Sequence, residues 1–193
     1  MHPAIFLDRD GVLIENRADY VRDWSQVVIL PNAIKALSSP ALKRYKIVIV
    51  TNQSAVGRGL MSMQTAHEIN ERLVEIVRAE GGHVDSVYMC PHKPEDLCAC
   101  RKPQPGLLLQ AARELSLDLQ ASWMIGDAWS DLLAGQAAGV RGVVLVRTGR
   151  GIEQLQQPFP EGLTSYRVFN DLLEAVEEIL NLDREVPASH AST

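Results

Sequence analysis

Five short apolar runs, separated by segments with helical periodicity, constrain the fold of this chain more than any other feature. Each run is too short for a helix, and the second is continuous and β-branched, as in strands that are covered on both faces. The runs occupy residues 4–7, 46–50, 84–89, 123–125 and 142–146. Because strands that alternate with helices form parallel sheets, the pattern predicts an α/β fold with a doubly wound, Rossmann-like, mainly parallel sheet.

Helical periodicity fills most of the chain between and after these runs. We expect helices at residues 32–44, 62–79, 106–115, 131–138 and 168–182. The second has the clearest beginning, because Ser62 is a good N-cap and Ile69 and Leu73 share one helical face. The 46% hydrophobic content of the 193 residues is typical of a folded domain. We therefore expect a single domain over residues 1–182 and a disordered tail over the small, polar residues 183–193.

The spacing of these elements leaves no room for a separate domain above the sheet. Between Thr51 and Lys102 the sequence provides one helix, one strand and a cysteine-containing loop, and the segment after Asp8 is short. Ligands of doubly wound sheets bind beyond the carboxyl ends of the strands. We therefore expect a capless domain whose ligand site is open to solvent.

The net charge of −5 argues against nucleic acid as a partner, because no basic field is available to bind a phosphate backbone. A phosphorylated small molecule requires only local positive charge. No apolar run approaches the roughly 18–20 residues of a membrane span, and the N-terminus has no basic leader. We therefore expect a cytoplasmic protein without a membrane partner, and the sequence leaves the oligomeric state open.

Two carboxylates lie two residues apart directly after the first predicted strand, in the Asp-Arg-Asp-Gly-Val of residues 8–12. One interpretation is a strand-ending turn, because Asp and Gly favour turns. The other is catalytic, with Asp8 as a nucleophile that attacks phosphorus and Asp10 as a general acid/base. Two carboxylates in one pocket repel each other, and a Mg²⁺ ion between them would relieve that repulsion.

Hydroxyl and amide groups that suit a phosphoryl group follow the second predicted strand, although such residues are also common in turns and helix caps. They belong to Thr51, Asn52, Gln53 and Ser54, with Arg58 as a nearby cation.

A basic pair and two further carboxylates occur later in the chain. Arg101 and Lys102 precede prolines that favour a fixed loop, and a fixed lysine is useful where charge builds on a transferred phosphoryl group. A solvated basic pair is the alternative. Asp127 follows the fourth predicted strand and is a candidate metal ligand. Asp131 suits either the same site or the N-terminus of the next helix.

The three cysteines of the chain lie with a histidine in one short stretch, and an odd number of cysteines is a poor disulfide framework. Three thiolates and one imidazole complete the tetrahedral set of a structural Zn²⁺ site, which leaves no position open for water. The predicted zinc ligands are Cys90, His92, Cys98 and Cys100. We expect zinc to stabilise the loop of residues 90–100 and to position the basic pair that follows it. Inert cysteines beside a surface histidine are the alternative.

Four motifs follow predicted strand ends in a fixed order: Asp8-x-Asp10-Gly-Val, Thr51-Asn52-Gln53, Lys102-Pro103 and Gly126-Asp127-x-x-x-Asp131. In this order they resemble the motifs of the haloacid dehalogenase superfamily of phosphohydrolases. The cysteine and histidine block with its following Arg-Lys-Pro is similar to the branch that contains the D-glycero-D-manno-heptose-1,7-bisphosphate 7-phosphatases and the histidinol-phosphatases. The resemblance covers about residues 4–150.

The resemblance implies a Mg²⁺-dependent phosphatase that works through an aspartyl-phosphate on Asp8, with Asp10 as the acid and then the base. It implies that Mg²⁺ binds the Asp8 carboxylate, the Asp10 backbone carbonyl and Asp127. Thr51 and Lys102 match positions that hold the phosphoryl group.

The resemblance also implies a set of substrate contacts. Arg101 matches a position that recognises substrate, and two further segments match substrate-contacting loops. Their residues are Asn16, Arg17, Asp19, Tyr20, Asn52, Gln53 and Ser54. A sugar phosphate with negative charge near Arg17, Arg58 or Arg101 fits an open site.

The implied substrate is the 7-phosphate of D-glycero-D-manno-heptose 1,7-bisphosphate, with histidinol phosphate or another small phosphomonoester as the alternative. The chain departs from the heptose enzymes in two places. The loop between His92 and Cys98 is shorter, and Ala128 stands where those enzymes commonly carry Lys.

Two non-enzymatic functions would use similar residues. A receiver-type phospho-acceptor domain also combines an acidic cluster, a hydroxyl and a lysine on a doubly wound sheet, but its acceptor follows a middle strand. A zinc-dependent interaction module would keep the cysteine cluster beside a vestigial active site. The position of the Asp pair after the first strand favours the phosphatase.

Overall fold

The computed structural model describes residues 1–185 and contains a six-stranded sheet in which every pairing is parallel. The strand order is β3-β2-β1-β4-β5-β6, so the first strand of the chain lies near the middle of the sheet. The strands are β1 (Ala4–Leu7), β2 (Lys46–Asn52), β3 (Ser86–Cys90), β4 (Trp123–Gly126), β5 (Gly142–Val146) and β6 (Arg167–Phe169). The predicted doubly wound α/β fold is thereby confirmed.

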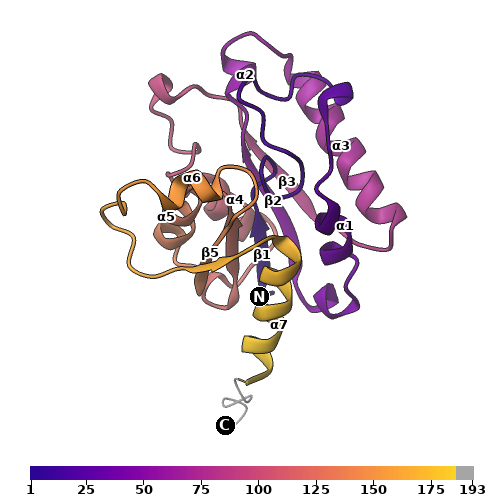
Figure 1. The fold of residues 1–193 in the computed structure, drawn as a ribbon, viewed down its shortest axis with the longest axis vertical. Coiled ribbons are helices and arrows are strands. Elements are labelled where there is room, and N and C mark those ends of the chain that lie inside the picture. The colour runs from indigo at the N-terminus through magenta and orange to yellow at the C-terminus, as the bar shows by residue number, and fades with distance from the viewer. Residues whose placement is uncertain (186–193) are drawn as a thin grey trace.

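Helices cover both faces of this sheet (Figure 1). One face packs against α1 (Pro31–Leu37), α3 (Met63–Ala79) and α7 (Leu172–Glu185). The other packs against α4 (Gly106–Glu114) and α5 (Trp129–Ala138). The short helices α2 (Ser54–Gly57) and α6 (Gly151–Leu155) each follow the carboxyl end of a strand.

Alternate strand residues enter the two cores, which explains why the strands are apolar throughout. Ile5 and Leu7 of β1 pack on the α1, α3 and α7 side, whereas Phe6 packs on the α4 and α5 side. In β2, Ile49 and Val50 divide in the same way. Burial of one such large apolar side chain stabilises the fold by roughly 1.5–3 kcal/mol.

Two predicted helices were wrong in their extent. The helix expected over residues 32–44 is divided into α1 and a 3₁₀-helix at Pro40–Arg44, because Pro40 cannot donate a helical hydrogen bond. The helix expected over residues 168–182 is preceded by β6, a strand too short to show a pattern in the sequence. The Asp171 side chain then accepts a hydrogen bond from the backbone N–H of Glu174, as an N-cap does.

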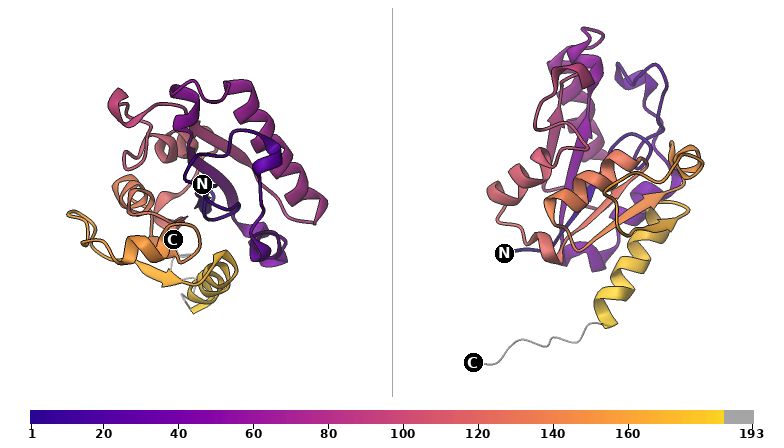
Figure 2. Two further views of the ribbon diagram at one scale, coloured as in Figure 1. Left: turned by 45° about the horizontal axis from the view of Figure 1, so that its top comes forward. Right: turned by 90° about the vertical axis from the view of Figure 1, so that its left-hand side faces the viewer.

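The C-terminal helix also extends beyond its predicted end, because α7 includes residues 183–185, which we expected to be disordered. Asp183 accepts hydrogen bonds from Tyr45 Oη and Arg141 Nη1, and these bonds hold this turn against the domain. Figure 2 shows α7 beside α1 from a second direction. The rest of the predicted tail, residues 186–193, lies outside the described residues.

The carboxyl edge of the sheet is free of any separate domain within residues 1–185. The chain between β2 and α4 forms only α2, α3, β3 and the cysteine loop, as expected of a capless domain. None of the helices in this described part of the chain is both long and apolar enough to cross a membrane.

Candidate active site and zinc centre

Buried polar side chains from three strands and one loop meet beyond the carboxyl edge of the sheet. Asp8 follows β1, Thr51 lies near the end of β2, Asp127 follows β4, and Lys102 lies in the loop before α4. Each is at most 4% exposed, a burial that polar groups tolerate only when they are paired. A cavity of about 490 Å³ opens over Asp8 and Lys102. Ligand pockets of this size accommodate small metabolites.

Lys102 is the central cation of this site. Its Nζ lies 2.7 Å from Asp8 Oδ1 and 2.7 Å from Asp131 Oδ1, and it donates a hydrogen bond of 2.8 Å to Val50 O. Burial alone would lower the pKa of Lys102, but the charges of Asp131 and Asp8 outweigh it and raise that pKa. Lys102 therefore stays charged next to the nucleophile position.

The carboxyl of Asp8 has a raised pKa. Burial raises the pKa of its carboxyl to about 6, with Asp131 and Asp10 adding to the rise and Lys102 opposing it. The carboxylate is nevertheless the main form at neutral pH, so Asp8 retains the negative charge that a nucleophile needs.

Asp8, Asp127 and Asp131 each offer a carboxylate oxygen within 4.8 Å of the others, a spacing that suits one metal ion. Asp131 accepts from Lys102 at Oδ1 and from the backbone N–H of Ala128 at Oδ2, so it has both roles that the sequence left open. Asp8 pairs with Lys102 and Asp127 pairs with Arg150, so each of the three carboxylates already has a cationic partner with which a metal ion would compete. Burial raises the pKa of Asp127, with Arg150 opposing and Asp8 adding to the rise. Mg²⁺ prefers oxygen ligands of this kind, and the donor set fits it.

Gly11 makes the approach to Asp127 possible. It has a φ of +91°, and a Cβ at this position would lie 2.1 Å from Asp127 Oδ2. Both the backbone conformation and the contact require glycine, which explains the Asp-x-Asp-Gly pattern of the first motif.

Asp10 lies at the cavity and is held from two sides. Arg9 Nη2 lies 2.9 Å from Asp10 Oδ2, and Gln53 Nε2 donates a hydrogen bond of 2.8 Å to the same oxygen. Arg9 is fully buried and also donates a bond of 2.9 Å to Asn70 Oδ1 of α3. Neither Arg9 nor Asn70 was expected from the sequence.

Some residues after the second strand line the cavity, and others hold those residues in place. Gln53 and Ser54 line the cavity. Thr51 is fully buried, is not among the lining residues, and accepts a bond of 2.9 Å from Gln53 Nε2. Asn52 also lines the cavity, but its amide bonds to the backbone of Lys102.

The loop after the first motif forms one wall of the cavity through Asn16, Arg17 and Tyr20. Two predicted contacts lie elsewhere. Asp19 is not a lining residue and forms exposed ion pairs of 3.2 Å with Arg17 and Arg22. Arg58 is likewise outside the lining and pairs with Glu95 at 3.6 Å.

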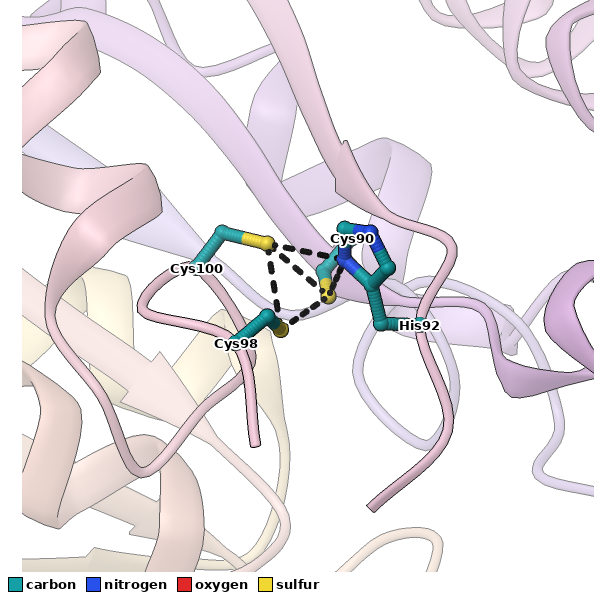
Figure 3. A group of neighbouring side chains, drawn as sticks. All are labelled: Cys90, His92, Cys98 and Cys100. Atoms are coloured by element: carbon teal, nitrogen blue, oxygen red, sulfur yellow. Dashed lines mark hydrogen bonds between the residues drawn. The ribbon is translucent and has the colours of Figure 1, made fainter. Parts of the chain in front are cut away.

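Figure 3 shows the three thiols and the imidazole converging on one point. His92 Nδ1 lies 3.5 Å from Cys90 Sγ and 3.3 Å from Cys100 Sγ, and the three sulfurs are 3.2–3.6 Å apart. Ligands of a tetrahedral zinc site with Zn–S bonds of about 2.3 Å lie roughly 3.8 Å apart. The cluster therefore fits Zn²⁺ closely.

Arg101 joins this cluster to the cavity. It follows Cys100 directly, and its Nη1 donates bonds of 2.8 Å to Ser54 Oγ and 3.1 Å to His92 O. Both Arg101 and Lys102 line the cavity, as expected if the cysteine loop positions them.

One charged residue of the cavity wall, Arg150, was not expected from the sequence. Arg150 lies after β5, lines the cavity and pairs with Asp127 at 2.9 Å. Its only sequence signal is the polar Arg-Thr-Gly-Arg-Gly run that ends the fifth apolar stretch.

Comparison with known proteins agrees with this arrangement. The HAD-hydrolase-like family model matches residues 99–175. The D-glycero-beta-D-manno-heptose-1,7-bisphosphate 7-phosphatase of Pseudomonas aeruginosa is 35% identical and aligns with 91% of this chain and 97% of its own. The protein of the same name from Bordetella bronchiseptica is 37% identical over 91% of this chain and 97% of its own.

Solved structures show the same similarity. The crystal structure of D,D-heptose 1,7-bisphosphate phosphatase from B. bronchiseptica, complexed with magnesium and phosphate, matches with a TM-score of 0.85 and 36% identity. The match covers 93% of this chain and 99% of that chain. The chain therefore belongs to the haloacid dehalogenase-like phosphatases, in the branch that contains the heptose-1,7-bisphosphate 7-phosphatases.

Proposed function

We propose that this chain hydrolyses the 7-phosphate of D-glycero-D-manno-heptose 1,7-bisphosphate, with Asp8 as the nucleophile. The observation that carries the proposal is the pairing of Asp8 Oδ1 with Lys102 Nζ at 2.7 Å beneath a cavity that also contains Asp10. The names of the relatives from P. aeruginosa and B. bronchiseptica support the choice of substrate.

In the first step, the free carboxylate oxygen of Asp8 attacks phosphorus, and the bond between phosphorus and the sugar oxygen breaks. Asp10 donates its proton to that leaving oxygen, so the sugar departs as a neutral alcohol. Lys102 neutralises charge on the transferred group. Gln53 keeps Asp10 directed into the cavity through its 2.8 Å hydrogen bond.

In the second step, water attacks phosphorus, and Asp10, now ionised, takes the proton of that water. The bond between phosphorus and Asp8 breaks, which releases inorganic phosphate and regenerates both carboxyl groups. Mg²⁺ bound by Asp8, Asp127 and the Asp10 backbone carbonyl would supply positive charge that offsets the repulsion between the carboxylates and the phosphate.

The zinc cluster has a structural role in this proposal. A saturated Cys₃His site has no position for a substrate or water. Its ligand Cys100 immediately precedes Arg101 and Lys102, so zinc would fix the loop that delivers both cations.

The cellular setting follows from charge and cysteine usage. We place the chain in the cytoplasm, where the three thiols stay reduced for zinc, and the net charge of −5 argues against nucleic acid as a partner.

Phosphate release by the purified chain with Mg²⁺ tests the proposal. The substrates are heptose 1,7-bisphosphate, histidinol phosphate and common sugar monophosphates, and we expect the bisphosphate to give the highest kcat/KM. Asp8→Asn should fold and show no turnover. If histidinol phosphate is hydrolysed with the highest kcat/KM, it replaces the heptose bisphosphate as the proposed substrate. Full activity in Asp8→Asn would overturn the mechanism. A phospho-Asp that persists in intact-mass spectra would favour the receiver-type function instead.

A further inference from the structure

Arg150 occupies both carboxylate oxygens of Asp127. Its Nη2 lies 2.9 Å from Asp127 Oδ1, its Nε 3.2 Å from Oδ2, and its backbone N–H donates a bond of 2.8 Å to Oδ2. Bidentate pairs of this kind are among the stronger charge-assisted contacts. A cation at Asp127 would therefore lie directly beside the guanidinium unless Arg150 moves.

The two partners differ in their freedom to move. Asp127 is completely buried, whereas the Arg150 side chain is 43% exposed and lines the cavity. Arg9 and Lys102, the other two cations that pair with the buried carboxylates of this site, have side chains that are only 1% exposed. Arg150 is thus the one cation of these three that is able to leave its carboxylate without entering the core.

The local charge balance explains when it would leave. Asp8, Asp10, Asp127 and Asp131 pair with three cations, so this ion-paired group keeps one net negative charge while Arg150 is paired with Asp127. Arg101 of the cavity wall bonds to Ser54 and His92 instead and is outside this group. A divalent cation at Asp8 and Asp127 would reverse that sign and place Arg150 next to a like charge. Repulsion between neighbouring cations then favours Arg150 in the open cavity.

We propose that Arg150 is an exchangeable counter-cation: it neutralises Asp127 in the metal-free protein and, when Mg²⁺ binds, turns into the cavity to contact the second anionic group of the substrate. The second half of this statement rests on the proposed bisphosphate substrate, whereas the first half concerns Mg²⁺ alone. Arginine suits the task because its planar fork binds phosphate oxygens in pairs.

Calorimetric titration with Mg²⁺, in the absence of substrate, tests the first half. Arg150→Gln removes the competing charge, and we expect it to bind Mg²⁺ roughly fivefold more tightly than the wild type, the size expected for a partly exposed ion pair. Arg147→Gln is the matched control, because Arg147 is exposed on the same segment and contacts Asn170 instead. Equal or weaker Mg²⁺ binding by Arg150→Gln would overturn the exchange.

Steady-state kinetics at saturating Mg²⁺ test the second half. We expect the KM of Arg150→Gln for heptose 1,7-bisphosphate to rise about tenfold, while its KM for p-nitrophenyl phosphate, which has one phosphate, changes less than about twofold. An equal change for both substrates would overturn the substrate contact.

The outcomes separate the two proposals. If the wild type does not hydrolyse the heptose bisphosphate, the proposed function fails, while the Mg²⁺ titration still decides whether Arg150 competes for Asp127. Should Arg150→Gln fail to fold, Arg150→Lys is the second variant, because it keeps the charge but loses the bidentate contact. It should bind Mg²⁺ more tightly than the wild type, with a smaller gain in affinity than that expected for Arg150→Gln. Wild-type Mg²⁺ affinity in that folded variant would overturn the exchange.

Discussion

Asn52 and Lys102 form a reciprocal pair of hydrogen bonds across fifty residues of sequence. Asn52 Nδ2 donates to Lys102 O at 3.1 Å, and the backbone N–H of Lys102 donates to Asn52 Oδ1 at 3.1 Å. The Asn52 side chain at the end of β2 thereby fixes the loop from which Lys102 reaches Asp8. Asn52 is thus a positioning residue as well as a residue of the cavity wall.

Asn52→Ala should lower kcat for p-nitrophenyl phosphate about tenfold, because two bonds worth about 1 kcal/mol each no longer hold the Lys102 loop. KM should change little. Asn16→Ala, which alters the cavity wall without touching this loop, is the comparison. A rise in KM at constant kcat would instead make Asn52 a substrate contact, as the sequence predicts.

The raised pKa of Asp8 makes its ionisation costly to the fold. The folded carboxyl has a pKa of about 6 against an ordinary value of 3.8, so the folded state binds the proton more tightly than the unfolded state between these values. Without Mg²⁺, the free energy of unfolding should therefore fall as pH rises from about 3.8 to 6.

Asp8→Asn should accordingly stabilise the metal-free protein at pH 7 by about 1–3 kcal/mol, since one pKa unit corresponds to about 1.36 kcal/mol. The gain should disappear near pH 3, below both pKa values, where Asp8 is protonated in the folded and the unfolded state. Urea denaturation at both pH values measures it, with the exposed Asp19→Asn as control. A gain of equal size at both pH values would show that it does not come from the buried charge of Asp8.

Removal of zinc should lower both stability and activity. The purified protein should contain one equivalent of zinc by atomic absorption, and Cys98→Ser should lose it with a fall in Tm. Because Arg101 and Lys102 follow the ligand Cys100, kcat should fall at least about tenfold even below the melting temperature. Unchanged folding and activity after chelation would exclude a structural zinc site.

Arg9 should contribute more to stability than its partner Asn70. Arg9→Met leaves Asp10 without its buried cation and should cost about 3–5 kcal/mol. Asn70→Leu removes one acceptor from Arg9 but leaves the ion pair, and it should cost about 1–3 kcal/mol. Urea denaturation measures both, and the reverse order would mean that Asn70, not Asp10, is the main partner.

The sheet could be predicted from the sequence because its strands are short, apolar runs that each end in a polar residue. β1 and β2 are buried on both faces, so nothing polar interrupts them. β6 could not be predicted in this way, since it has three residues and begins with the exposed Arg167. Its pairing with β5 comes from tertiary contact rather than from a local pattern.

The candidate site was predictable where a residue type after a strand or in a proline-containing loop carries the chemistry, as with Asp8, Asp127 and Lys102. Supporting residues were not, because their role depends on distant partners. Asn70 resembles any polar residue of α3 until its contact with Arg9 is known, and Arg150 resembles a surface arginine until Asp127 is placed beside it.

The position of β1 has a consequence for how the active site is made. β1 is translated first, but only one of its edges pairs with β2, and the other edge pairs with β4, which is translated much later. The hydrogen bond from Ala4 N to Ser122 Oγ, for example, spans 118 residues. Long-range pairings of this kind form slowly during folding. Until residue 126 leaves the ribosome, the nucleophile stands at the end of an open, apolar strand edge, which is a template for aggregation. A nascent or prematurely terminated chain that ends before β4 therefore exposes Asp8 without the site that forms around it in the complete sheet.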